Sequence, residues 1–597
     1  MKEIIEESAF VQSSYDFELD IERNSKVEYR YAYKKDVKLK GIVCIIPGFG
    51  DDTDSEYSEY LRTYIAKTFD VVAVHVVYHC FYSRETNGAR VVLDKTDEEM
   101  LFKNLRFAGI SKLDNSSLNS IFKQLDSAVT LMKDKGEMLQ EAALNQTVTL
   151  LPKNDEYQNF GILQALDHIN VLRDLTKKDF AFIDQYPVTL IGSSHGGYIA
   201  YLIAKFAPNL IDCVIDNSAY VKPPLRYVVG KDLDVQQPEY RQTSRNIVLH
   251  YFVKTYWCND VDSYYYFSKD RLDIRDVSKD RHMKVVSQVS KNRIKYVAYH
   301  YADDTIAPLD EKKAFYKKLR KLGFDASLQI ISTAADVDGK FIKSLEHGLN
   351  MSIKELVTRE LPNALKLRNF SRTKMLEPIS YECESLVYNF QMRDNVFTAV
   401  ITPREDIQEK IMTTFEDNMS YFEKYQPELY NKLASFDSAV EQGLYQHRYD
   451  LVFENNSFNV QELEKNRYLY QQDSNKFSYE IAQKFQQQTE RFIFFGVGLG
   501  LHLTSIDKKI AGQHYLIVED DLELFKFSTF VTSYATLAQS AKLYFSVFDK
   551  EEQFFVIAED FIQKSVRRDR NIMHYLMPYH ADSKKNYFNT TFGMTHE

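Results

Sequence analysis

Alternating and continuous apolar segments succeed each other along the first half of the chain. Apolar and polar residues alternate over residues 9–33, which predicts an antiparallel pair of strands. Short, almost wholly apolar runs follow at 40–46, 70–77, 188–191 and 211–216, with segments of helical spacing among them. Such runs are typical of strands that are covered on both faces. The pattern therefore predicts an α/β fold with a mostly parallel central sheet and helices on both faces.

Two long polar segments interrupt this pattern, and a change of character follows it. Residues 82–160 are irregular and partly helical, and residues 217–290 are rich in Tyr, Arg and Asp. We treat both as insertions, the first a candidate cap over an active site and the second a candidate lid or binding region. The alternative for the second is that its aromatic residues serve ordinary packing. Near residue 405 the chain becomes helical and charged, and short strands follow. We therefore expect one domain over 1–405 and a smaller α/β Rossmann-like domain over 406–597, with a polar tail from about 565.

The segment after the apolar run at 188–191 carries the clearest chemical signal. Gly192-Ser-Ser-His-Gly196 matches G-x-S-x-G, and the residues that follow have the apolar spacing of a helix. A strand, a tight turn flanked by glycines and a helix form a nucleophile elbow, in which a side chain on either neighbour would collide with the backbone. The pattern predicts that Ser194 is a nucleophile at the N-terminus of a helix. The alternative is a plain strand-to-helix turn that contains a serine.

A Pro-Gly turn follows the apolar run at 40–46. An α/β-hydrolase places an oxyanion-hole loop after an early central strand of this kind. The turn at 47–50 suits that role, with the backbone N–H of Phe49 as one donor and that of His195 as the other. Taken alone, the same residues are compatible with an ordinary turn.

An acidic residue and a histidine follow two later strands. Asp304 comes after the apolar segment at 294–299, and His347 lies beyond the one at 327–331. The chain order Ser, Asp, His is that of the α/β-hydrolase triad. We expect His347 to take the proton of Ser194 and Asp304 to hold the imidazole in the correct tautomer.

Other acids compete for the third place in the triad. Pro308 stands four residues after Asp304, as in the D-x-x-V-P loop of many α/β-hydrolases, which favours Asp304. Asp303 is the runner-up, and Asp216, at the end of another strand, is a weaker alternative.

A second glycine-rich turn lies in the C-terminal domain. Gly496, Gly498 and Gly500 follow an apolar strand, and Glu519 ends the next strand. Glycines allow a nucleotide to approach the backbone, and a carboxylate accepts its ribose hydroxyls, so these four residues are candidates for cofactor binding. The spacing departs from G-x-G-x-x-G. The alternative is a packing turn without a ligand.

Composition and charge narrow the functional classes. The formal net charge of −10 leaves no basic excess to neutralise the phosphates of nucleic acid. The five cysteines form no C-x-x-C pair, and we expect no metal and no required cofactor. The N-terminus has no signal-peptide pattern, and the longest apolar stretch, 492–503, is too short to span a bilayer. We expect a cytoplasmic protein.

Residues from about 10 to 400 resemble a family of α/β-hydrolase-like proteins encoded with flagellar glycosylation genes in some flagellated bacteria. The matching stretches are Pro47-Gly-Phe-Gly50, Gly192-Ser-Ser-His-Gly-Gly197, Tyr301-Ala-Asp-Asp-Thr-Ile-Ala-Pro308 and Glu346-His-Gly348.

Residues from about 415 to 560 resemble the N-terminal domain of motility accessory factor glycosyltransferases. The likeness is carried by Pro427-Glu-Leu-Tyr430, Phe494-Phe-Gly-Val-Gly-Leu-Gly500, Tyr515-Leu-Ile-Val-Glu519 and residues 525–534. Those enzymes transfer nonulosonic, sialic-acid-like sugars to Ser and Thr of flagellin. The chain stops about where their catalytic domain would begin, so the resemblance implies a docking or scaffold module here.

These observations lead to one main hypothesis and two alternatives. The main hypothesis is a serine esterase or acyl-transferring enzyme that acts through an acyl-Ser194 intermediate. The resemblances imply that its substrate is an acylated nonulosonate sugar or flagellin glycan, with flagellin or a flagellar glycosyltransferase as a possible partner. The first alternative is a non-catalytic scaffold that assists flagellin glycosylation. The second is a nucleotide or S-adenosylmethionine site at Gly496 to Glu519.

Overall fold

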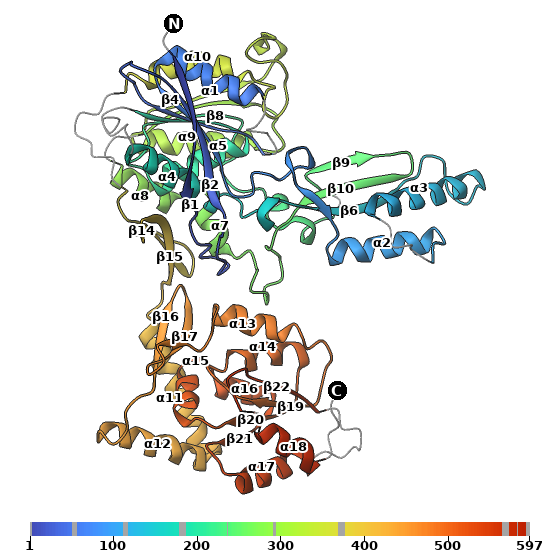
Figure 1. Ribbon diagram of the computed structural model, residues 1–597, viewed down its shortest axis with the longest axis vertical. Helices are drawn as coiled ribbons and strands as arrows, with labels where there is room; N and C mark the ends of the chain where they lie inside the picture. The colour runs from blue at the N-terminus through green and yellow to red at the C-terminus, as the bar shows by residue number, and fades with distance from the viewer. Residues whose placement is uncertain are drawn as a thin grey trace. The chain divides into compact units, whose positions relative to one another are not determined.

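The chain forms two compact units. The computed structural model describes residues 3–49, 56–111, 117–177, 187–235, 237–290, 294–367, 376–563, 572–581 and 583–592. The first unit comprises Met1–Asp16 and Ile21–Val400, and the second comprises Phe17–Asp20 and Ile401–Glu597 (Figure 1). The sequence predicts the boundary near 405, but it does not predict that Phe17–Asp20 belongs with the C-terminal unit.

An eight-stranded sheet forms the centre of the first unit. Its order is β1-β2-β4-β3-β7-β8-β11-β12. The strands are β1 (Ile4–Gln12), β2 (Lys26–Lys34), β3 (Ile42–Ile46), β4 (Val72–Val77), β7 (Val188–Ser193), β8 (Cys213–Asn217), β11 (Lys295–Tyr301) and β12 (Ala326–Ile331). The pairings of β2 with β1 and β4 are antiparallel, and every pairing from β4 to β12 is parallel. An antiparallel start followed by this parallel order is the α/β-hydrolase fold, which confirms the predicted fold class.

Helices cover this sheet on both faces. On one face, Leu61 and Ile65 of α1 (Glu56–Phe69) and Leu361 of α10 (Ile353–Ala364) pack with Val43 and Ile215 of the sheet. Elsewhere α4 (Ile162–Lys177) and α5 (His195–Phe206) contact each other and the sheet, and every residue of α5 is buried. Further helices of the first unit are α6 (Leu225–Val228), α7 (Lys269–Arg275), α8 (Asp280–Val289) and α9 (Leu309–Lys321). Because its strands are covered on both sides, the sheet needs the continuous apolar runs seen in the sequence.

The two insertions build one subdomain. The strands β5 (Arg90–Val92), β6 (Leu144–Leu151), β10 (Ile247–Val253) and β9 (Tyr240–Thr243) form a four-stranded sheet in that order. The parallel pairing of β6 with β10 joins the first insertion to the second. Two helices, α2 (Lys95–Phe107) and α3 (Leu118–Asp134), accompany this sheet (Figure 1). We call this subdomain the cap.

A buried ion pair fixes the cap. Lys231 of the second insertion places its Nζ 2.7 Å from Asp94 Oδ2 and 2.6 Å from Asp97 Oδ1 of the first. The same Nζ lies 2.6 Å from the hydroxyl of Thr149 on β6. A three-stranded sheet of β13 (Ile379–Glu382), β14 (Leu386–Arg393) and β15 (Val396–Pro403) follows, and the boundary between the units falls within β15, after Val400.

The second unit is a smaller Rossmann-like α/β structure. Four parallel strands have the order β21 (Lys542–Val547), β20 (His514–Glu519), β19 (Arg491–Phe495) and β22 (Ile572–Leu576). Its helices are α11 (Ile407–Tyr425), α12 (Pro427–Glu441), α13 (Ser474–Ala482), α14 (Leu501–Ile510), α15 (Leu522–Val531), α16 (Tyr534–Ser540), α17 (Glu551–Gln563) and α18 (Ser583–Phe592). A small sheet of β16 (Tyr449–Glu454), β17 (Ser457–Glu462) and β18 (Arg467–Tyr468) is added to them.

The prediction of a polar tail from about 565 is wrong for the part of that segment that the structure describes. Residues 572–576 form β22, which pairs with β19, and Phe588 of α18 is buried. β22 is an edge strand that pairs in parallel with β19, about 80 residues earlier in the chain. Its five residues therefore give little local indication in the sequence that they form a strand.

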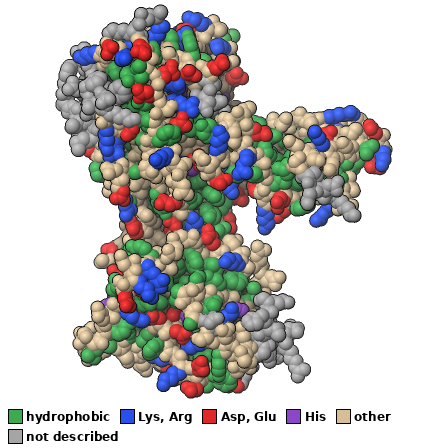
Figure 2. Space-filling model, in the orientation of Figure 1, with side chains coloured by type: hydrophobic (Ala, Val, Ile, Leu, Met, Phe, Trp, Pro, Cys, Tyr) green, Lys and Arg blue, Asp and Glu red, His purple; other side chains and the backbone are tan. Residues whose placement is uncertain are grey.

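The surface that Figure 2 shows carries basic and acidic side chains interspersed over both units. Within the described ranges, every helix is too short or too polar to cross a bilayer.

Candidate active site

The turn between β7 and α5 has the geometry of a nucleophile elbow. Ser194 has φ 51° and ψ −117°, a backbone conformation that non-glycine residues rarely adopt. A Cβ on Gly192 would lie 2.4 Å from the backbone nitrogen of Gly197, and one on Gly196 would lie 2.1 Å from the carbonyl oxygen of Ile46. The glycines are therefore required by close backbone approach, and the turn lifts the Ser194 hydroxyl to the end of the sheet.

Three side chains meet at this turn through two hydrogen bonds. Ser194 Oγ lies 2.7 Å from His347 Nε2, and His347 Nδ1 lies 2.7 Å from Asp304 Oδ2. Asp304 follows β11 and His347 lies between β12 and α10. The structure thus brings together the serine, histidine and acid that the sequence pattern selected. The carboxyl ends of parallel strands share one edge of the sheet, which explains why distant segments converge there.

The surroundings of Asp304 favour its ionised form. Burial opposes ionisation, but the hydrogen bond with His347 and the two backbone N–H groups of Ile306 and Ala307, each 2.9 Å from Oδ1, lower the pKa of Asp304 below its ordinary value. An ionised Asp304 accepts the Nδ1 proton of His347. His347 Nε2 is then left to accept the proton of Ser194.

The competing acids have other partners. Asp303 is exposed, and Tyr301 donates to it at 3.5 Å. Asp216 is buried in an ion pair with Lys312 at 2.8 Å and accepts the backbone N–H of Ala219 at 3.0 Å. Asp304 is therefore the acid that the geometry places against the histidine.

The predicted oxyanion donors lie at the same edge of the sheet. β3 and β7 pair in parallel with Ile46 opposite Gly192, which sets the turn after β3 beside the elbow. The rings of Phe49 and His195 lie 5.6 Å apart at 89°. Within the described residues, the backbone N–H groups of Phe49 and His195 donate no hydrogen bond. Gly50, the last residue of the predicted turn, lies outside the described residues.

The side chain of His195 has a structural role. Its Nε2 donates to Gln164 Oε1 at 2.8 Å, and its Nδ1 accepts from the hydroxyl of Tyr220. Burial lowers the pKa of His195 to about 3, so the ring is neutral. These bonds hold the first residue of α5 in place.

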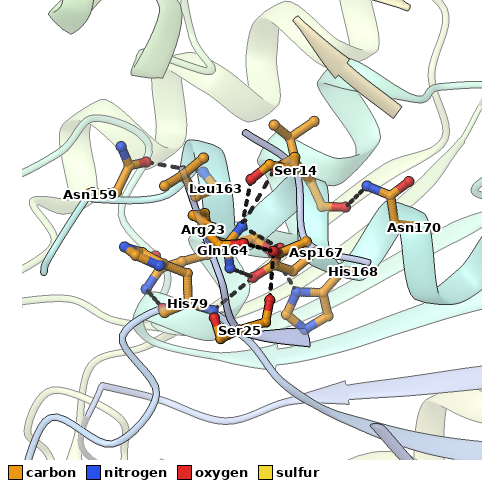
Figure 3. A network of polar contacts seen from close by, with 12 residues as sticks. Ser14, Arg23, Ser25, His79, Asn159, Leu163, Gln164, Asp167, His168 and Asn170 are labelled. Atoms are coloured by element: carbon orange, nitrogen blue, oxygen red, sulfur yellow. Dashed lines mark hydrogen bonds and ion pairs between the residues drawn. The ribbon is translucent and has the colours of Figure 1, made fainter. Parts of the chain in front are cut away.

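Gln164 belongs to a buried polar network on α4 (Figure 3). Its Nε2 donates to the carbonyl of His79 at 3.1 Å, and the N–H of His79 donates to Asp167 at 2.8 Å. Asp167 also receives a two-pronged hydrogen bond from Arg23, at 2.8 and 2.9 Å. The network ties the N-terminal segment to the helix that contacts the elbow helix.

A cavity of about 200 Å³ opens beside the serine. It is lined by Phe49, Arg84, Phe160, Ser194, His195, Tyr220, Tyr227, Glu239, Ile306 and His347. The sequence predicts that the two insertions cover the site, but it does not single out Arg84 or Glu239, the charged residues that they contribute. The sequence shows only that Arg84 lies in the first insertion and Glu239 in the second, which is rich in Tyr, Arg and Asp.

The second candidate site, in the second unit, brings its four predicted residues together. The N–H of Val497, within the glycine turn, donates to Glu519 Oε2 at 2.8 Å, so the turn and the acid meet at the end of β19 and β20. Glu519 is buried, and burial raises its pKa above the ordinary value.

The glycine turn is filled by the chain's own side chains. A Cβ on Gly496 would lie 2.8 Å from Met577, one on Gly498 2.5 Å from the hydroxyl of Tyr470, and one on Gly500 2.8 Å from Thr532. The N–H of Gly498 donates to the hydroxyl of Tyr579 at 2.5 Å, and that of Leu499 donates to Tyr470 at 2.9 Å. The donors that a phosphate would use are therefore paired within the protein, and the glycines admit tyrosine and methionine side chains. Among the described residues, no group of three or more His, Cys, Asp or Glu side chains is placed to hold a metal ion.

Solved structures similar to this chain include an acylaminoacyl peptidase and the protein Est1E. The acylaminoacyl peptidase of Pyrococcus horikoshii is 11% identical with a TM-score of 0.32, and the match covers 63% of this chain and 44% of the peptidase. Est1E of Butyrivibrio proteoclasticus is 13% identical with a TM-score of 0.29, and the match covers 57% of this chain and 95% of Est1E. Both likenesses are distant, so the fold assignment rests on the strand order.

Two family models match the sequence, whereas no curated protein does. Residues 480–568 match the model described as "Glycosyltransferase Maf N-terminal domain". The predicted resemblance spans about 415–560, so the match begins about 65 residues later and ends about 8 residues later. Residues 8–401, more than half of the chain, match the model described as "Protein of unknown function (DUF2920)", and the chain therefore belongs to the DUF2920 family.

Proposed function

We propose that this protein is a serine esterase or acyl-transferring enzyme that acts through an acyl-Ser194 intermediate. The observation that carries the proposal is the hydrogen-bonded series Ser194, His347 and Asp304 on a nucleophile elbow that opens into a cavity. A strained serine at a helix N-terminus with a histidine at 2.7 Å is the arrangement that nucleophilic acyl transfer requires.

The reaction follows from the positions of these groups. His347 Nε2 takes the proton of Ser194 Oγ while the oxygen attacks the ester carbonyl carbon. The N–H groups of Phe49 and His195 stabilise the oxyanion, and Asp304 stabilises the imidazolium. His347 then gives the proton to the leaving alcohol oxygen, and the C–O bond breaks to leave acyl-Ser194. His347 then takes a proton from water, or from a hydroxyl of an acceptor, while that oxygen attacks the acyl carbon. The bond between this carbon and Ser194 Oγ breaks, and His347 returns the proton to Ser194 Oγ.

For the substrate, we propose an acylated nonulosonate sugar or flagellin glycan. Support comes from the Maf N-terminal domain match at 480–568 and from the resemblance to proteins encoded with flagellar glycosylation genes. Flagellin or a flagellar glycosyltransferase is the partner that this association favours, and the cytoplasm is the compartment where they would meet.

A second candidate function is a non-catalytic scaffold for flagellin glycosylation. The observation that favours it is the filled glycine turn of the second unit, where Tyr470 and Tyr579 occupy the place of a nucleotide. Because the turn leaves few backbone donors for a phosphate, this hypothesis gives the unit a docking role that needs no nucleotide. On this hypothesis, Ser194→Ala leaves glycosylation intact, whereas deletion of residues 406–597 abolishes it.

The experiment that tests the enzyme proposal is hydrolysis of a panel of p-nitrophenyl acyl esters. We expect turnover by the natural protein and loss of it in Ser194→Ala. Ser193→Ala is the matched control, because Ser193 is the neighbouring serine and its hydroxyl accepts from Asn217 at 3.3 Å. Equal activity in all three proteins would contradict the proposal.

A further inference from the structure

Two charged side chains line the cavity that contains Ser194, and each comes from a different insertion. Arg84 precedes the short 3-10 helix Glu85–Asn87, and Glu239 precedes β9. Their side chains are 20% and 5% exposed. Both backbones are fixed, because the N–H of Arg84 donates to Asn87 at 2.9 Å and that of Glu239 donates to the carbonyl of Tyr251 at 3.0 Å.

The two charged groups face each other without closing into a hydrogen bond. Arg84 Nη1 lies 3.9 Å from Glu239 Oε2, whereas a direct hydrogen-bonded pair is about 2.8 Å apart. Both atoms are buried, and neither has a hydrogen-bond partner among the described residues. Elsewhere the groups are held, since Glu239 Oε1 accepts from Val253 at 3.3 Å and the guanidinium lies 4.4 Å from the ring centre of Tyr240. The surrounding structure therefore keeps the two groups apart, and a polar atom that lies to one side of the line joining Nη1 and Oε2 is within hydrogen-bond distance of both.

We propose that Arg84 and Glu239 form a polar clamp that selects esters with a hydroxyl or secondary amide group near the ester bond. This inference rests on the proposed function, and it narrows the substrate to an ester that carries a neutral hydroxyl or secondary amide group beside the ester bond. A hydroxyl oxygen accepts from Arg84 Nη1 and donates its proton to Glu239 Oε2. An amide does the same through its carbonyl oxygen and its N–H.

Other substrate classes leave the clamp unsatisfied. An alkyl chain fits among Phe49, Phe160 and Ile306 but leaves both buried charged atoms without partners, which a site built for hydrogen bonds disfavours strongly. A carboxylate reaches Arg84 only by lying beside the carboxyl group of Glu239, where two like charges oppose each other when Glu239 is ionised. A neutral group with both a donor and an acceptor meets neither obstacle.

Matched esters test the clamp on both sides of the ester bond. On the acyl side we compare p-nitrophenyl 3-hydroxybutanoate with the butanoate and the hemisuccinate. On the alcohol side we compare an O-acetylated N-acetylhexosamine with cyclohexyl acetate. We expect the natural protein to prefer the hydroxylated or amidated member of at least one series by about 10- to 100-fold in kcat/KM. Arg84→Met and Glu239→Leu should bring that ratio close to one, and Glu239→Gln, which keeps an acceptor, should retain part of it.

Arg90→Met is the control variant, because Arg90 lies in the same insertion with its side chain 70% exposed and should leave the ratio unchanged. If hydrolysis depends on Ser194 but shows no preference in either series, the clamp is contradicted and the proposed function stands. A preference that persists in Arg84→Met has the same meaning. A thermal shift of Ser194→Ala by the same esters measures binding without turnover. If the esters bind in a manner that depends on Arg84, but the natural protein hydrolyses none of them, the clamp is supported and the proposed function is contradicted.

Discussion

At the scale of single residues, the role of each aspartate near the edge of the sheet depends on the groups that its carboxyl contacts. Asp216 faces Lys312, Asp303 faces solvent and one tyrosine, and Asp304 faces His347. Asp303 and Asp304 are neighbours in the sequence, yet one is exposed and the other buried. The backbone N–H groups of Ile306 and Ala307 lock the Asp304 carboxylate in one orientation.

Asp304→Asn should lower kcat by about 10³- to 10⁴-fold, because the amide no longer holds His347 in the tautomer that accepts the serine proton. The measurement is turnover of the best p-nitrophenyl ester. Asp303→Asn is the matched control and should stay within about threefold of the natural protein. Similar losses in both variants would contradict the assignment of Asp304.

Glu239 predicts a pH-dependent stability. Burial raises its pKa from 4.5 to about 7, with Arg84 acting in the opposite direction. The folded state thus binds this proton more tightly than the unfolded state, so the contribution is fully present below pH 4.5 and is lost as pH rises towards 7. Glu239→Gln should therefore raise the melting temperature at pH 8 by several degrees more than at pH 5. An equal change at both pH values would contradict this pKa.

At the scale of elements, local patterns explain which parts of the site the sequence predicts. The elbow, the Pro47 turn and the strand that precedes Asp304 are each defined by contiguous residues. Parallel strands end at the same edge of the sheet. A serine, an aspartate and a histidine that each follow such a strand are therefore expected to meet there. The cap sheet has no such signal, since β6 and β10 pair across about 100 residues. Arg84 and Glu239 therefore could not be placed together, and the charged side chains gave no hint of a shared cavity.

Gly196→Ala should disrupt the elbow, because the new Cβ would lie 2.1 Å from the carbonyl of Ile46 and 2.4 Å from that of Pro47. We expect at least a 100-fold loss of esterase activity and a loss of stability of about 2–4 kcal/mol, measured by thermal unfolding. In Gly136→Ala, a Cβ has no atom within 4 Å and only the φ of +74° is unfavourable. This control should lose about 1 kcal/mol and keep its activity. Full activity in Gly196→Ala would contradict the close approach of the two turns.

For the whole molecule, the division into two compact units, each with its own buried clusters, implies two unfolding events. Leu361 is buried in the core of the first unit and Leu433 in that of the second. The Maf-like segment lies wholly within the second unit, and the residues proposed for catalysis lie wholly within the first. The proposed chemistry and the proposed docking are therefore assigned to different units.

Scanning calorimetry of the full chain should resolve two transitions. Leu433→Ala should lower one of them, by a loss of about 2–5 kcal/mol, and leave ester hydrolysis unchanged. Leu361→Ala should lower the other transition. If both variants shifted both transitions equally, the two units would not be independent.

The most direct test of the central claim is the site of covalent labelling by a fluorophosphonate. The reagent reacts with a serine that a neighbouring base activates, so we expect one adduct per chain, mapped by peptide mass to Ser194. The adduct should persist in Ser193→Ala and disappear in Ser194→Ala. No adduct on the folded natural protein, or one that survives Ser194→Ala, would contradict nucleophilic catalysis by Ser194.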